Sequence, residues 1–138
     1  MIFTIYLAHK WDFNHSWSYQ TKTAWVNWYT SQGHPKEKIK QWTEDFMFIK
    51  IGETSNLANR RKNLGRPVKH TFEFEGTYAD ALFIESYLRA TIEHRYKQNC
   101  RHHGNDYFYC INTNIIRSLD KNFEKWCNEG YQLLQRLA

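Results

Sequence analysis

The clearest pattern in the chain is a strict alternation of apolar and polar side chains over residues 68–75. Because successive side chains of a strand point to opposite faces of a sheet, this period of two predicts a half-buried strand. Two other short segments, Ile2–Leu7 and Phe46–Gly52, are rich in β-branched and aromatic residues and also predict strands. A fourth apolar run, Tyr107–Ile111, predicts a strand or a buried segment at the sheet edge.

Apolar residues that recur every three or four positions predict helices in the second half of the chain. The longest helix is expected at residues 77–98, and its apolar line consists of Ile84, Leu88 and Ile92. A last helix is expected to begin at a Ser118 cap and to be interrupted at Gly130. Two segments without a period predict loops, residues 9–18 and the basic stretch Lys97–Gly104.

Three shorter helices are expected around the second strand. Two precede it, one at residues 21–30 and one at residues 36–45 that Pro35 opens. One follows it, capped by Thr54 or Ser55 and ended by Gly65–Pro67. This order predicts an α+β fold with a small, mainly antiparallel three-stranded sheet flanked by helices, and with a helical insertion between the first two strands.

Length and charge narrow the class of protein. The chain has 138 residues, which favours one domain over residues 1–138, with an insertion at 9–45 and a C-terminal helical extension at 113–138. A net charge of +5 and a pI of about 9.1 favour a polyanionic partner, nucleic acid first. No apolar run approaches the roughly 20 residues of a membrane span, so no membrane partner is expected. Three cysteines fit a reducing compartment and predict a cytoplasmic, intracellular protein.

A phosphate-binding arrangement is indicated at residues 51–61. An apolar strand runs into Gly52, a polar helix start follows, and Arg60 and Arg61 lie on the first turns of that helix. An arginine side chain can bind a phosphate through two parallel hydrogen bonds. The alternative is that both arginines belong to a solvated helix face.

Two half-motifs in the first two strands resemble those of a nuclease family. Thr4-Ile5-Tyr6 resembles the first half, and Lys50-Ile51-Gly52 the second half, of a GIY-YIG nuclease domain. In that family an arginine follows the glycine by eight positions, and here that residue is Arg60. The family also places a glutamate in a long helix, in a pattern that Ala81–Leu88 matches and that gives Glu85.

The segment Gly104–Phe108 resembles the ending of a phage-type subgroup, in which Lys-Ile-Gly often replaces Tyr-Ile-Gly. The resemblance therefore implies a phage- or virus-encoded protein. The chain departs from the family at the insertion of residues 9–45, at Lys50 in place of the second tyrosine, and at Leu64, where a histidine is frequent. The insertion is expected to be either a substrate-recognition element or a packing cap over the sheet.

The resemblance implies a metal-dependent endonuclease that hydrolyses phosphodiester bonds in DNA. Glu85 would hold a single Mg²⁺ or Mn²⁺ ion, because these ions prefer hard oxygen ligands. Arg60 would clamp a phosphate. Tyr6 would accept a proton from water if a cation such as Lys50 lowers its pKa from about 10. Cutting both strands with one active site per chain would suggest a homodimer.

Each of these residues also has a purely structural interpretation. Tyr6 can be a strand aromatic that packs in the core, and Lys50 can be an edge-strand charge. Glu85 and Arg89 are four residues apart on one helix and can simply pair. A carboxylate beside the apolar line of that helix nevertheless needs a partner or a metal.

Basic side chains along the chain are expected to neutralise DNA phosphates. They are Lys36, Lys38, Lys40, Arg61, Lys62, Arg66, Lys69, Arg101 and His102. An alternative function is a catalytically inactive nucleic-acid-binding module with the same fold, which Lys50 and Leu64 favour. A third is a zinc-stabilised domain built on Cys100–His103 and Cys110, although this spacing is not a standard zinc signature.

Overall fold

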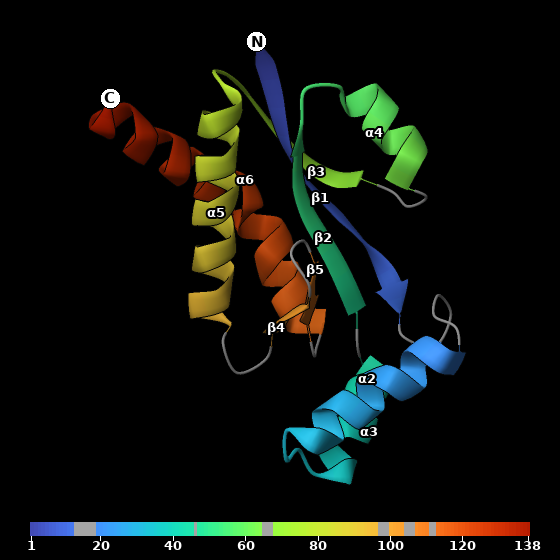
Figure 1. The fold of residues 1–138 in the computed structure, drawn as a ribbon. Coiled ribbons are helices and arrows are strands. Elements are labelled where there is room, and N and C mark those ends of the chain that lie inside the picture. The colour runs from blue at the N-terminus through green and yellow to red at the C-terminus, as the bar shows by residue number, and fades with distance from the viewer. Residues whose placement is uncertain (13–18, 46, 65–67, 97–99, 104–106, 111–112) are drawn as a thin grey trace.

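The computed structural model describes residues 1–12, 19–45, 47–64, 68–96, 100–103, 107–110 and 113–138 (Figure 1). The elements are β1 (Ile2–Asp12), α2 (Tyr19–Ser31), α3 (Lys36–Asp45), β2 (Met47–Thr54), α4 (Leu57–Leu64), β3 (Val68–Glu75), α5 (Tyr78–Arg95), β4 (Cys100–His103), β5 (Tyr107–Cys110) and α6 (Thr113–Leu137). None of the helices in this described part is long and apolar enough to cross a membrane.

The five strands form one sheet in the order β3-β1-β2-β5-β4, and every neighbouring pair is antiparallel. The predicted α+β class is confirmed, and β2-β1-β3 is the expected antiparallel three-stranded unit. The strands β5 and β4 extend this unit beyond β2. Pairing of β5 with β2 covers Met47 to Lys50 only, so β2 has no neighbouring strand on that side after Lys50 in the described part of the chain.

Two predicted loops are partly strands. The first strand continues through Asp12, which pairs with Met47, although residues 9–18 were expected to form a loop. The basic stretch Lys97–Gly104 contains β4, in which Cys100 pairs with Cys110. In both places pairing with a neighbouring strand forms the element, although the side chains of these segments show no period that would indicate a strand. Residues 13–18, 97–99 and 104 lie outside the described residues.

The cap of α4 is one residue later than expected. The Asn56 side chain accepts a hydrogen bond from the backbone N–H of Asn59 at 3.0 Å, which is the N-cap interaction. Thr54 stabilises the turn before the helix, because its hydroxyl accepts a hydrogen bond from the backbone N–H of Asn56 at 3.0 Å. Ser55 is therefore not the cap, and the proposed stop at Gly65–Pro67 lies outside the described residues.

The last helix is longer and less broken than expected. It begins at Thr113, so Ser118 is an internal residue whose hydroxyl accepts a hydrogen bond from Tyr96 at 2.5 Å. It also continues through Gly130 without interruption. A Cβ at Gly130 would lie 2.9 Å from the ring of Tyr87 on α5, so this glycine allows the two helices to approach closely.

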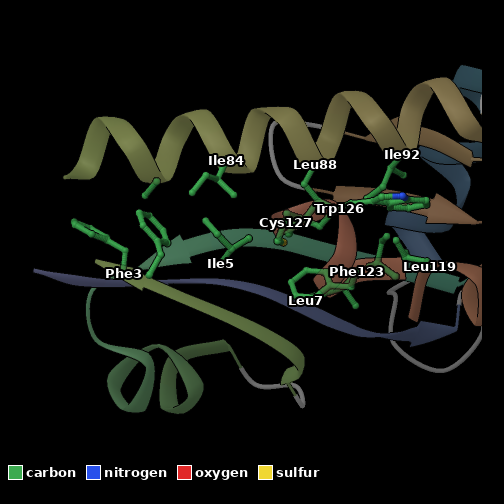
Figure 2. Packing of buried hydrophobic residues seen from close by; sticks show 14 of the residues in the cluster. Phe3, Ile5, Leu7, Ile84, Leu88, Ile92, Leu119, Phe123, Trp126 and Cys127 are labelled. Carbon is green, nitrogen blue, oxygen red and sulfur yellow. The ribbon is translucent and has the colours of Figure 1, made fainter. Parts of the chain in front are cut away.

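The main core lies between one face of the sheet and the helices α5 and α6 (Figure 2). Ile5 and Leu7 of β1 face Ile84 and Leu88 of α5, and all four side chains are fully buried. The side chains that α6 adds to this core are Ile115, Ile116, Leu119, Phe123, Trp126 and Cys127. Residues 113–138 therefore complete the core, and α4 lies on the opposite side of β1 and β2 from α5 (Figures 1 and 2).

Candidate functional site

Tyr6 and Gly52 form the centre of the candidate site. They are directly opposite each other in the β1–β2 pair. A Cβ built on Gly52 would lie 2.6 Å from Cζ of Tyr6 and would collide with the Tyr6 hydroxyl. The ring of Tyr6 thus lies over the Gly52 backbone. The glycine of the second half-motif is required here because any side chain would occupy the space of the tyrosine ring.

Tyr6 points away from the main core. Its neighbours Ile5 and Leu7 face α5 and α6, and alternation along the strand directs Tyr6 to the side of the sheet where α4 lies. Its side chain is only 1% exposed, so the structural interpretation as a packed aromatic is compatible with its burial. Lys50, half-buried, lies on the same face, because it is two residues from Gly52 and pairs with Ala8. The structure therefore places Tyr6 and Lys50 on one face of the sheet.

Glu85 approaches β2 from the opposite side. Nη2 of Arg89 donates to Oε1 of Glu85 at 2.8 Å and to the backbone carbonyl of Ile51 at 3.0 Å. The side chains of Arg89 and Glu85 are 17% and 11% exposed. The pairing of these two residues on α5, which was the alternative interpretation of Glu85, is present. The link to Ile51 was not expected, and it connects the Glu85 carboxylate to the residue just before Gly52.

The Ile51 carbonyl is available to Arg89 because of where β5 ends. Pairing between β2 and β5 stops at Lys50, so the backbone after Lys50 faces no strand on that side within the described residues. We call this part of β2, residues 51–54, the open edge. Glu85 is linked to the open edge through Arg89, and the Tyr6 ring lies over Gly52 of this edge.

Arg60 lies on the helix that follows the open edge. The backbone N–H of Arg60 donates to the carbonyl of Asn56 at 3.0 Å, which places Arg60 at the start of α4. Thr54 and Asn56 fix the turn between β2 and α4, so the offset between Gly52 and Arg60 is set by local hydrogen bonds. Its helix α4 lies on the Tyr6 side of the sheet (Figure 1). Arg60 is half-buried, whereas the neighbouring Arg61 is exposed.

The predicted DNA-contacting residues fall on separate elements. Lys36, Lys38 and Lys40 are exposed on α3, Arg61 and Lys62 on α4, and Lys69 on β3. Lys36 and Lys40 also border a cleft of about 400 Å³ between α2 and α3, together with Val26, Thr30 and Ile39. Arg101 and His102 belong to β4, and Arg66 lies outside the described residues. The cations whose side chains are described therefore lie on three different elements, α3, α4 and β3.

Metal-binding groups are few around this site. Among the described residues, no three His, Cys, Asp or Glu side chains gather so that they could hold a metal ion. A single carboxylate such as Glu85 suits Mg²⁺ or Mn²⁺ in donor type, because Mg²⁺ keeps most of its waters. The bond from Arg89 is of the kind that outer groups make to ligating carboxylates. The side chains of the zinc hypothesis, Cys100–His103 and Cys110, lie outside those described.

Comparisons with known proteins give one match. A protein-family model described as the T5orf172 domain matches residues 24–127. This range includes Lys50, Arg60, Glu85 and Arg89, whereas Tyr6 lies before it. No curated protein and no solved structure matches the chain.

Proposed function

Because the chain belongs to the T5orf172 domain family, which is phage-associated and nuclease-related, we propose that it is a metal-dependent endonuclease of the GIY-YIG type. Its substrate is DNA, in which it hydrolyses phosphodiester bonds. The observation that supports this best is the arrangement around the open edge of β2. Tyr6 approaches it from one side and Glu85 from the other, and α4 with Arg60 follows directly in the chain.

Arg60 binds the scissile phosphate in this proposal. Its guanidinium presents a fixed fork of donors that matches two phosphate oxygens and stabilises their developing negative charge. The exposed lysines of α3 and α4 hold the flanking DNA backbone. Residues Lys36, Lys38, Lys40 and Lys62 thus contribute affinity without contacting the reacting atoms.

Tyr6 takes the proton of the attacking water. Lys50, on the same face of the sheet, stabilises the phenolate form of Tyr6, which accepts this proton and becomes the neutral phenol. Because Tyr6 is buried, this role requires that DNA binding at the open edge of β2 admits water to its hydroxyl.

Glu85 is the proposed ligand of a single divalent ion. A Mg²⁺ or Mn²⁺ ion there would supply positive charge that stabilises the phosphoryl and leaving oxygens. Arg89 orients the Glu85 carboxylate inside a site that is mostly closed to water.

An inactive DNA-binding module is the second candidate. It is favoured by the buried Tyr6 hydroxyl, by the existing Glu85–Arg89 ion pair and by Lys50 in place of the second tyrosine. In that case the open edge has only a structural role, and the exposed lysines alone would account for the function.

Supercoiled plasmid separates the two candidates. The full chain is incubated with plasmid and Mg²⁺ or Mn²⁺, beside Glu85→Gln, Arg60→Ala and a control, Arg117→Ala, at an exposed arginine on α6. An endonuclease converts the plasmid to nicked or linear forms, Arg117→Ala retains most of this activity, and the other two variants lose it. If the wild-type chain retards DNA in a gel but leaves it uncut under both ions, the inactive module is the correct function.

A further inference from the structure

Arg89 connects two parts of the molecule that are far apart in sequence. One amino group, Nη2, donates both to Glu85 on the same helix and to the Ile51 carbonyl on β2, which is 38 residues away. The carbonyl acceptor belongs to the residue just before Gly52, over which the Tyr6 ring passes. The guanidinium therefore fixes the distance between the α5 carboxylate and the strand that carries the second half-motif.

This arrangement differs from an ordinary ion pair on a helix surface. An exposed pair four residues apart moves freely and is screened by solvent. Here both side chains are mostly buried, and the third partner is a backbone carbonyl held in a sheet. The Glu85 carboxylate consequently has one preferred position relative to the open edge of β2.

We infer that Arg89 is a positioning residue that holds Glu85 ready to bind a divalent cation at the open edge of β2. The inference rests on the proposed function, because it takes Glu85 as the metal ligand. Carboxylates that bind metals are commonly oriented by outer hydrogen-bond donors, and loss of such a donor typically weakens metal binding by about 10- to 100-fold. Lysine cannot replace the arginine fully, since its ammonium is a rotatable point charge on a flexible stem and lacks the fixed planar geometry of the guanidinium.

A role for Arg89 as a simple counter-charge of Glu85 predicts a change in Mn²⁺ affinity of the opposite sign. If Arg89 only neutralises an idle carboxylate, its positive charge competes with the cation for Glu85. Removal of Arg89 would then leave Mn²⁺ binding unchanged or make it tighter. The sign of the change in Mn²⁺ affinity therefore distinguishes the two roles.

The test measures Mn²⁺ binding to the purified full chain by electron paramagnetic resonance, without DNA. The variants are Arg89→Met, Arg89→Lys and Glu85→Gln. The control is Tyr87→Phe. Tyr87 lies two residues from Arg89 on α5, and this change removes a 3.3 Å hydrogen bond to Glu129 of α6. We expect binding to be about 10- to 100-fold weaker in Arg89→Met, intermediate in Arg89→Lys, lost in Glu85→Gln and unchanged in the control.

Folding and activity are followed in parallel. Circular dichroism reports whether each variant folds, and Arg89→Lys, which keeps the charge beside Glu85, carries the test if Arg89→Met does not fold. In the plasmid assay, high Mn²⁺ concentration should rescue the arginine variants but not Glu85→Gln.

Unchanged or tighter Mn²⁺ binding in the folded arginine variants overturns the inference, as does the absence of Glu85-dependent binding in the wild-type chain. Glu85-dependent binding that Arg89→Met weakens, without plasmid cleavage by the wild type, would support the role of Arg89 and reject the nuclease. Plasmid cleavage by the wild type, together with Mn²⁺ binding that the Arg89 variants do not change, would support the nuclease and reject the role of Arg89.

Discussion

The ring of Tyr6 lies over the backbone of Gly52, in space that any side chain at position 52 would need. Gly52→Ala should therefore push the tyrosine out of place and reduce the free energy of unfolding by about 1–3 kcal/mol. Urea denaturation of the wild-type and variant chains measures this loss. In a Tyr6→Leu background the same alanine should cost less, because the shorter side chain leaves room. Equal costs in the two backgrounds would contradict the steric explanation.

Removing the Tyr6 hydroxyl tests its proposed role as the proton acceptor. Tyr6→Phe keeps the ring over Gly52 and should reduce the rate of plasmid cleavage by about 10²- to 10⁴-fold, the usual contribution of a general base. DNA affinity in a gel-shift assay and the melting temperature should change little. A variant that cleaves at the wild-type rate would show that Tyr6 has only a packing role.

Binding of the DNA backbone by α3 should be visible in the salt dependence of the affinity. Lys36 and Lys40 are exposed and border the same cleft between α2 and α3. Each lysine that neutralises a phosphate adds about 0.9 to the slope of log K against log salt, so the double alanine variant should have a slope that is smaller by about 1–2. Lys125→Ala, at an exposed position on α6, is the matched control. An unchanged slope in the double variant would show that this helix does not bind DNA.

The buried thiol of Cys127 should make stability decrease at alkaline pH. Burial, with a smaller contribution from Glu124, raises the pKa of Cys127 well above its ordinary value of 9.0. The unfolded chain then loses this proton at lower pH than the folded chain, so the stabilisation is full below pH 9 and is lost as the pH rises above it. Comparison of unfolding free energies of wild type and Cys127→Ala from pH 7 to about 10.5 isolates the effect. A difference between the two that does not change with pH would argue against it.

Local patterns predicted the elements whose periods are complete in the sequence. The strand β3 and the helix α3 have the bounds that alternation and Pro35 indicated. The errors concern features that depend on a distant partner. The strand β4 is a run of only four residues that pairs with β5, and the reason for Gly130 is the ring of Tyr87 on another helix.

In the candidate site too, the features set by local sequence could be predicted and those that depend on a distant partner could not. The spacing from Gly52 to Arg60 could be predicted because a single turn, held by Thr54 and Asn56, determines it. The pairing of Glu85 with Arg89 could be anticipated from their separation on one helix. The bond from Arg89 to Ile51 could not, because its acceptor is a backbone carbonyl and carries no signature in the sequence.

The open edge of β2 has a consequence for solubility as well. A strand edge with unpaired carbonyls is a template on which a strand of another molecule can add. Arg89 already occupies the carbonyl of Ile51, and its positive charge lies where such a strand would have to approach. The same bond that orients Glu85 therefore protects the protein against edge-to-edge aggregation, and a chain that loses this arginine should be more prone to form β-rich aggregates.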